Sequence, residues 1–94
     1  MAAEERTRTE VHYLGQVQGV GFRQKTFAIA SDYRVGGYVT NLSDGRVLVV
    51  AEGVADEVAS FLAEVEASLK RFIDGASVRQ AAATGEFQSF EIKY

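Results

Sequence analysis

The spacing of apolar residues divides the chain into strand-like and helix-like segments. Residues 11–17 alternate between apolar and polar side chains, with Val11 and Tyr13 on one face, which predicts a strand. From Phe22 the apolar residues recur at helical spacing, which predicts a helix. Because glycine favours the left-handed turn that ends many helices, we expect this helix to end at the Val-Gly-Gly of residues 35–37.

The second half of the chain shows the same change of spacing. Residues 38–42 and 46–53 are valine-rich runs on either side of an Asp-Gly pair, which is a strong sign of two strands joined as a hairpin. A long amphipathic helix follows, and the glycine of residues 74–75 is expected to close it. Residues 76–84 resemble a weak strand, and residues 89–94 alternate cleanly again.

The order of these elements predicts the fold. A β-α-β-β-α-β chain with a short extra C-terminal strand is typical of the ferredoxin-like split βαβ fold, in the α+β class. We therefore expect a four-stranded antiparallel sheet with two helices on one face. The first and third strands should be central, and the first and second should also be neighbours because a crossover helix joins them. Residues 1–9 are expected to form a flexible tail, and residues 10–94 a single domain.

Composition limits the possible classes of function. The 94 residues are 47% hydrophobic and 24% charged, as expected for one soluble globular domain. A net charge of −3 gives no overall basic field for nucleic acid or anionic membranes. The absence of cysteine excludes disulfides and thiolate catalysis. No apolar segment approaches the length of about 18 residues that spans a membrane, and the polar start lacks a signal peptide, so we expect a cytoplasmic protein.

The segment from Gly15 to Arg23, GQVQGVGFR, is the first candidate for a site. It precedes the first predicted helix, and its three glycines permit dihedrals that aim consecutive N–H groups at one point. A cation such as Arg23 is unfavourable in a first helical turn unless an anion binds there, and its planar guanidinium matches phosphate. The segment therefore fits a site for a small dianion, but a glycine-rich connector with an exposed arginine fits it equally well. The spacing is neither that of a P-loop nor that of a dinucleotide-binding loop.

Asn41 is the second candidate. It ends a predicted strand just before the turn at residues 43–45, where asparagine often bonds its own backbone. If the first and second strands are neighbours, Asn41 could instead lie near the glycine-rich segment. The single histidine, His12, lies mid-strand and is interpreted as structural.

At these residues the chain resembles the acylphosphatases, small hydrolases that split carboxyl–phosphate mixed anhydrides. The family's signature V-Q-G-V-x-F-R is matched from Val17 to Arg23, and its second signature, G-x-V-x-N-x-x-x-G, from Gly37 to Gly45. The ending FEIKY is similar to that of some members. The two signatures stand in the family's order, and the resemblance extends from about residue 11 to the end of the chain.

The resemblance implies a function and a role for each matched residue. Arg23 and the main-chain N–H groups of the loop would hold the phosphoryl group, and Asn41 would orient the attacking water. The loop residues concerned are Gln18, Gly19, Val20, Gly21, Phe22 and Arg23. The substrate would be an acyl phosphate, with inorganic phosphate as product or competitive ligand, no cofactor and no metal. We expect a monomer that binds neither nucleic acid nor membranes.

The chemistry of acyl phosphates agrees with this small set of groups. The leaving carboxylate has a conjugate acid with a pKa of about 4, so no general acid has to protonate it. Phosphoryl transfer depends mainly on positioning and electrostatic stabilisation, which an amide cradle, one arginine and one asparagine can supply.

Departures from the family and two other functions keep part of the interpretation open. Tyr38 and Thr40 stand where members often carry tryptophan and a basic residue, which leaves the substrate preference open. Whether Lys93 and Tyr94 contribute to the site is also open. A non-catalytic module could bind a small anion through the same loop, although a pure binder needs no water-orienting Asn41. RNA-binding domains share the strand order, but the predicted strands lack their basic-glycine-aromatic run and the chain is acidic.

Overall fold

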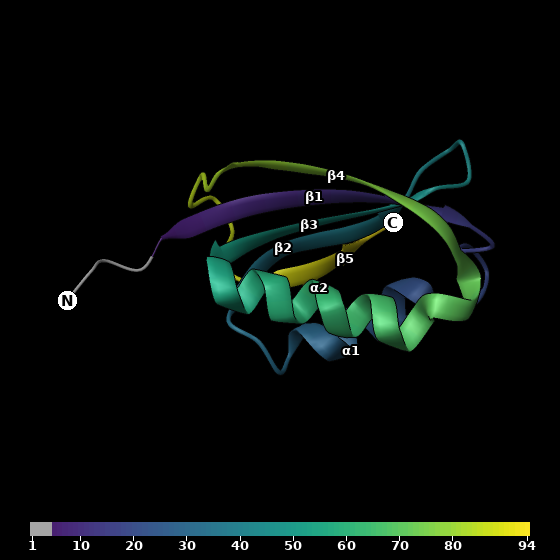
Figure 1. Cartoon of the computed structure of the whole chain (residues 1–94), viewed down its shortest axis with the longest axis horizontal. Coiled ribbons are helices and arrows are strands. Elements are labelled where there is room, and N and C mark those ends of the chain that lie inside the picture. Colours follow the sequence, from purple (N-terminus) through teal and green to yellow (C-terminus); the bar gives the residue numbers. More distant parts are fainter. Residues whose placement is uncertain (1–4) are drawn as a thin grey trace.

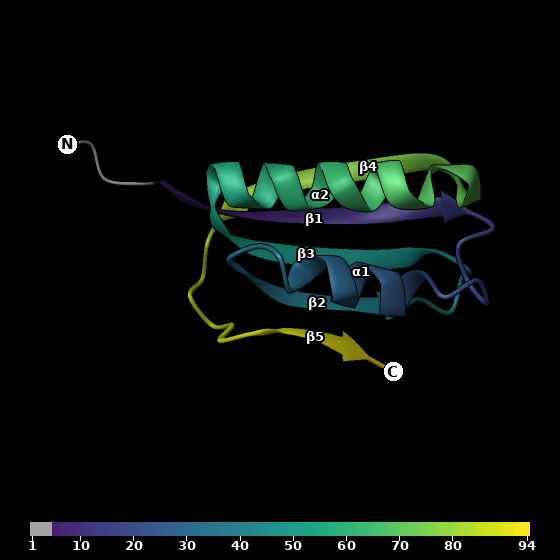
Figure 2. The same ribbon diagram turned by 90° about the horizontal axis from the view of Figure 1, so that it is seen from below.

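Two helices lie against one face of a five-stranded sheet in the computed structural model, which describes residues 5–94 (Figures 1 and 2). The strands are β1 (Arg6–Gly15), β2 (Val35–Asn41), β3 (Val47–Val54), β4 (Ile73–Ala82) and β5 (Phe90–Lys93). The helices are α1 (Phe22–Ala30) and α2 (Ala55–Leu69), with a 3-10 turn, η1 (Lys70–Phe72), after α2. The predicted α+β order with an extra C-terminal strand is confirmed. No helix within the described range is long and apolar enough to cross a membrane.

The strand order of the sheet is β4-β1-β3-β2-β5. As predicted, β1 and β3 form an antiparallel central pair. The C-terminal strand β5 runs parallel to β2, so the sheet as a whole is mixed. The prediction that the first and second strands are neighbours is wrong, because β3 lies between β1 and β2. In a split βαβ unit the two strands joined by the crossover helix are separated by one further strand, and here β3 is inserted between β1 and β2.

The hydrophobic core lies between the sheet and the two helices. Tyr13, Phe22 and Phe61 are among the largest side chains that are fully buried. The ring centroids of Tyr13 and Phe22 are 5.4 Å apart, and those of Phe61 and Phe90 are 5.2 Å apart in an edge-to-face contact. Burying a side chain of this size contributes about 1.5–3 kcal/mol to folding. Because Phe22 is the first residue of α1, this packing also fixes where the helix starts and where the next residue, Arg23, projects.

The glycines expected to end the two helices lie in strands. α1 ends at Ala30, and Gly37 belongs to β2 with a φ of +139°. A Cβ at Gly37 would lie 1.8 Å from the carbonyl oxygen of Val50 in β3, so glycine is required by a close approach of two strands. Residues 74–75 likewise lie in β4, beyond the end of α2.

The predicted tail over residues 1–9 is wrong for residues 6–9, which belong to β1 and pair with β3 and β4. Residues 1–4 lie outside the described part of the chain. Polar residues are tolerated in this strand because alternate side chains point to the sheet face opposite the helices. Arg8 points to that face and forms an ion pair there with Glu52 of β3. A polar segment can thus be a strand with partners far along the chain.

Residues 83–89, here called the strap, connect β4 at one edge of the sheet to β5 at the other (Figure 2). The strap is held by Glu52, which is only 4% exposed and accepts hydrogen bonds from Thr84 N at 3.1 Å, Thr84 Oγ1 at 2.8 Å and Gly85 N at 3.0 Å. Burial raises the pKa of Glu52, but these bonds and Arg8 outweigh it and lower the pKa to about 2. The charged carboxylate therefore keeps the strap in place, and β5 in register with β2.

Candidate functional site

The loop from Gln16 to Gly21, between β1 and α1, presents a row of unpaired backbone N–H groups. Gly19 and Gly21 have φ values of +78° and +80°. Nothing lies within 4 Å of a Cβ built at either position, so glycine is required by the dihedral angle and not by space. Within residues 5–94, none of the N–H groups from Gln18 to Arg23 donates to another backbone group. Such a row at a helix start is suited to bind an anion.

The start of α1 has no side-chain cap. Its N-cap residue, Gly21, is in the left-handed region and supplies no side-chain hydrogen bond, and the first turn contains no acidic residue. Most helices satisfy a donor at this end with a serine, threonine, aspartate or asparagine. The N-terminus of α1 therefore keeps its positive partial charge, and an anion is the partner that would complement it.

Arg23 projects from this first turn with no acidic partner among the described residues. Its guanidinium carbon lies 4.8 Å from the ring centroid of Tyr94, a cation–π distance. The parallel pairing of β5 with β2 brings the C-terminal residue to this place. Tyr94 is 90% exposed, so the contact lies at the surface. The sequence left the roles of Lys93 and Tyr94 open; the Lys93 ammonium lies over the ring of Tyr38, at 4.1 Å.

Asn41 is the last residue of β2, beside the hairpin turn. Its Oδ1 atom is buried and has no hydrogen-bond partner in the part of the chain that the structure describes. The turn itself is closed by another side chain, since Asp44 Oδ1 accepts a hydrogen bond from Arg46 N at 3.1 Å. A buried acceptor left without a donor costs about 1–3 kcal/mol. Asn41 Oδ1 is thus one of two buried side-chain atoms whose hydrogen bonding is incomplete within the described residues, the other being Thr26 Oγ1.

Gln18 connects the glycine loop to the hairpin that follows Asn41. Its Nε2 atom donates to the carbonyl oxygens of Leu42, at 2.8 Å, and Arg46, at 3.0 Å. This contact links the two sequence motifs although β3 separates β1 from β2. The sequence motif pointed to the main chain of Gln18, and nothing in the local sequence indicated this role for its side chain.

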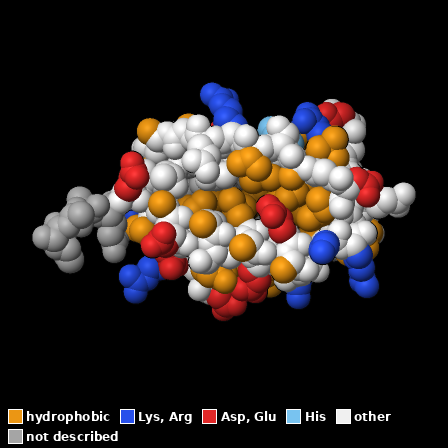
Figure 3. Space-filling model, viewed as in Figure 1, with side chains coloured by type: hydrophobic (Ala, Val, Ile, Leu, Met, Phe, Trp, Pro, Cys, Tyr) orange, Lys and Arg blue, Asp and Glu red, His pale blue; other side chains and the backbone are white. Residues whose placement is uncertain are grey.

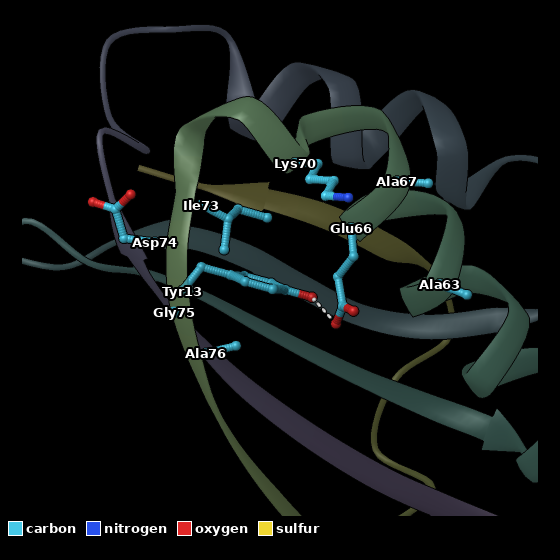
Figure 4. A pocket seen from close by; sticks show the side chains of 9 residues that line it. All are labelled: Tyr13, Ala63, Glu66, Ala67, Lys70, Ile73, Asp74, Gly75 and Ala76. Carbon is cyan, nitrogen blue, oxygen red and sulfur yellow. Dashed lines mark hydrogen bonds between the residues drawn. The ribbon is translucent and has the colours of Figure 1, made fainter.

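A separate hollow of about 520 Å³ lies between α2 and β4, lined in part by Tyr13 and Glu66 (Figure 4). The Tyr13 hydroxyl donates to Glu66 Oε2 at 3.2 Å, and burial together with this carboxylate strongly raises the pKa of Tyr13. Apolar side chains gather along this side of the molecule, next to an acidic one (Figure 3). None of the site residues predicted from the sequence lines this hollow.

Comparison with known proteins establishes the family. The model of the family named Acylphosphatase matches residues 9–92. The chain belongs to the acylphosphatase family. An acylphosphatase from Oceanobacillus iheyensis is 40% identical to it over 87 residues, which cover 90% of this chain and 96% of that protein. An acylphosphatase from Archaeoglobus fulgidus is 37% identical over 86 residues, with 90% and 96% of the two chains covered.

Solved structures of acylphosphatases have the same fold. The crystal structure of acylphosphatase from Bacillus subtilis matches with a TM-score of 0.83 at 29% identity, covering 94% of this chain and 99% of that one. Full-length HypF, in its phosphate- and nucleotide-bound form, matches with the same TM-score and identity over 99% of this chain and 12% of HypF. The predicted family and fold are confirmed, and with them the activity of a hydrolase acting on acyl phosphates. The RNA-binding interpretation of the fold is correspondingly disfavoured.

Proposed function

We propose that this acylphosphatase hydrolyses acyl phosphates without a metal ion, with the phosphoryl group held by the Gln18–Arg23 loop and the water oriented by Asn41. The observation that carries the proposal is the coincidence of unpaired main-chain donors and an unpaired guanidinium on one short segment at an uncapped helix start. HypF, a structural neighbour, was crystallised in a phosphate-bound form, which agrees with phosphate as a ligand.

In the binding step, the phosphoryl oxygens accept hydrogen bonds from the loop N–H groups and from Arg23. The guanidinium of Arg23 can contact two oxygens at once, and such charge-assisted bonds are stronger than neutral ones. The donors are fixed in place by the buried ring of Phe22 and by the left-handed glycines, so little reorganisation is needed as charge develops. The loop thereby stabilises the equatorial oxygens of the transition state.

In the chemical step, water attacks phosphorus and the anhydride P–O bond breaks. Asn41 Oδ1 accepts a hydrogen bond from the water and holds it in line with the leaving carboxylate. The water's proton passes to a phosphate oxygen, so the products are a carboxylate and inorganic phosphate. The leaving group needs no proton, which explains how the reaction proceeds without a general acid.

The alternative of a non-catalytic anion-binding module uses the same loop and the same arginine. Asn41 favours the hydrolase, because a pure anion binder has no use for an amide that orients an attacking water.

The test of the proposal is phosphate release from benzoyl phosphate by the purified protein, in excess EDTA and after addition of Mg²⁺. We expect hydrolysis that EDTA leaves unchanged and that inorganic phosphate inhibits competitively. Activity that EDTA abolishes and Mg²⁺ restores would overturn the metal-independent mechanism. A folded protein that releases no phosphate would instead support the anion-binding module.

A further inference from the structure

We infer that the side chain of Gln18 is a positioning residue, which fixes Asn41 relative to the phosphate-binding loop. The inference rests on the proposed function, and it assigns to this side chain a task separate from that of its main-chain N–H group.

The geometry of the contact fixes the orientation of the Gln18 amide. Nε2 lies 2.8 Å from Leu42 O and 3.0 Å from Arg46 O, and carbonyl oxygens can only accept, so the amide nitrogen must face them. Leu42 N donates to the same Arg46 oxygen at 2.8 Å. The Gln18 amide is thus part of the hydrogen bonding that closes the hairpin, one residue beyond Asn41.

The topology explains why such a connection is needed. Asn41 is joined to β1 only through β3, where Val47 pairs with both Asn41 and Tyr13, and the loop that follows Gly15 lies outside these ladders. In the described chain, the two bonds of Gln18 are the hydrogen bonds that join residues 16–21 to residues 42–46. Without them, the ladders of β3 still place the end of β1 relative to Asn41, but no hydrogen bond holds the loop itself against the hairpin.

The contact is placed to affect catalysis more than stability. Gln18 is exposed, and a neutral hydrogen bond at the surface contributes little net free energy to folding. In-line attack, in contrast, is sensitive to small displacements of the water, and an error of about 1 Å can cost up to about a hundredfold in rate.

Gln18→Met removes both donors and keeps the length of the side chain. We expect kcat for benzoyl phosphate to fall on the order of tenfold, because Asn41 is no longer held beside the loop. The inhibition constant for inorganic phosphate should change little, because the main-chain donors and Arg23 remain. Gln18→Asn, which keeps the amide but is too short to reach both carbonyls, should behave in the same way.

Gln16→Met is the matched control. Gln16 is an exposed glutamine of the same loop, and its side chain makes no hydrogen bond to the residues that the structure describes. This variant should keep the wild-type kcat, and all three variants should keep the wild-type melting temperature.

A double-mutant cycle with Asn41→Ala decides the inference. If Gln18 acts through Asn41, Gln18→Met has no further effect on kcat once Asn41 is alanine. A wild-type kcat in Gln18→Met, or a full tenfold loss that persists in the Asn41→Ala background, overturns this inference and leaves the proposed function intact. A wild-type kcat in Asn41→Ala alone overturns the proposed role of Asn41, and this inference with it.

Discussion

Arg8 lies near the start of β1, and Arg23 lies in the first turn of α1, beyond the other end of that strand. The two arginines differ in whether carboxylates surround them. Arg8 is matched by carboxylates: it lies 2.8 Å from Glu10, 3.0 Å from Glu52 and 3.5 Å from Glu86. Arg23 has no acidic partner in the described chain and stacks on the exposed ring of Tyr94. The same type of side chain is therefore used in two ways in this account: Arg8 is matched within the fold, and Arg23 is the residue for which we propose a ligand.

The neighbouring polar groups at each end show the same contrast. Around Arg8, the Glu52 carboxylate accepts bonds from Thr84 and Gly85, so the strap is held by a nearly complete set of partners. At the other end, the loop N–H groups before Arg23 and the Oδ1 atom of Asn41 have no hydrogen-bond partner within residues 5–94. The candidate site is marked by these unmatched groups and not by the hollow of Figure 4, although a second hollow is lined in part by Val20 and Gly21 of the loop.

Replacing each arginine by alanine should have different consequences: loss of activity for Arg23 and loss of stability for Arg8. Arg23→Ala should lower kcat/KM on the order of a thousandfold, because a charged donor to the transition state is lost. Its melting temperature should stay that of the wild type, and Arg23→Lys should recover only part of the activity, since a point charge cannot form the bidentate contact. Arg8→Ala should be destabilised and still active when folded. Kinetics and thermal denaturation of both variants check this, and a reversed pattern would break the comparison.

Glu52→Gln should lower the free energy of unfolding by up to about 3 kcal/mol at neutral pH, as expected for a pKa lowered to about 2. The pKa in the folded state lies below the unfolded value, so this stabilisation is fully present above about pH 4.5 and is lost as the pH falls towards 2. Urea denaturation at several pH values is the measurement. Wild type should lose more stability than Glu52→Gln on acidification, and parallel curves for the two would show that Glu52 does not hold the strap by its charge.

Asn41→Ala should lower kcat about ten- to a hundredfold, because the attacking water is no longer oriented. Affinity for inorganic phosphate should be nearly unchanged, since phosphate binding depends on the loop and on Arg23. Steady-state kinetics with phosphate as inhibitor measure both quantities. A variant that lost phosphate affinity and kept its kcat would assign Asn41 to binding.

Tyr94→Ala should have the smallest effect. An exposed cation–π contact is worth about 0.5–1 kcal/mol, so KM should rise about two- to fivefold as Arg23 loses its stacked ring. Tyr94→Phe keeps the ring and should behave as the wild type. If Tyr94→Phe is as impaired as Tyr94→Ala, the hydroxyl and not the stacked ring is responsible.

Much of the fold was predictable because it depends on local periodicity. The apolar spacing located both helices, and the Asp-Gly pair located the hairpin, as Gly45 confirms with its φ of +94°. The errors concern long-range contacts. The need for glycine at position 37 comes from the carbonyl of Val50, and the strand character of residues 6–9 comes from pairing with β3 and β4. Neither contact leaves a signal in the neighbouring sequence.

The candidate site divides in the same way. Arg23 and Asn41 could be proposed from two motifs whose residue types suit phosphate and water, and their roles stay predictions. The contact of Arg23 with Tyr94 and the bridge from Gln18 to Leu42 depend on how distant segments pack. They could be found only when the loop, the hairpin and the C-terminal strand were seen together.

The most direct test of the contrast between the two arginines is a titration with inorganic phosphate of wild type, Arg23→Ala and Lys25→Ala, followed by NMR or calorimetry. Lys25 is an exposed cation two residues along the same helix and is the matched control for a general loss of charge. We predict that Arg23→Ala weakens phosphate binding about tenfold or more at an unchanged melting temperature, while Lys25→Ala stays near the wild type. Equal phosphate affinity in wild type and Arg23→Ala would contradict the account.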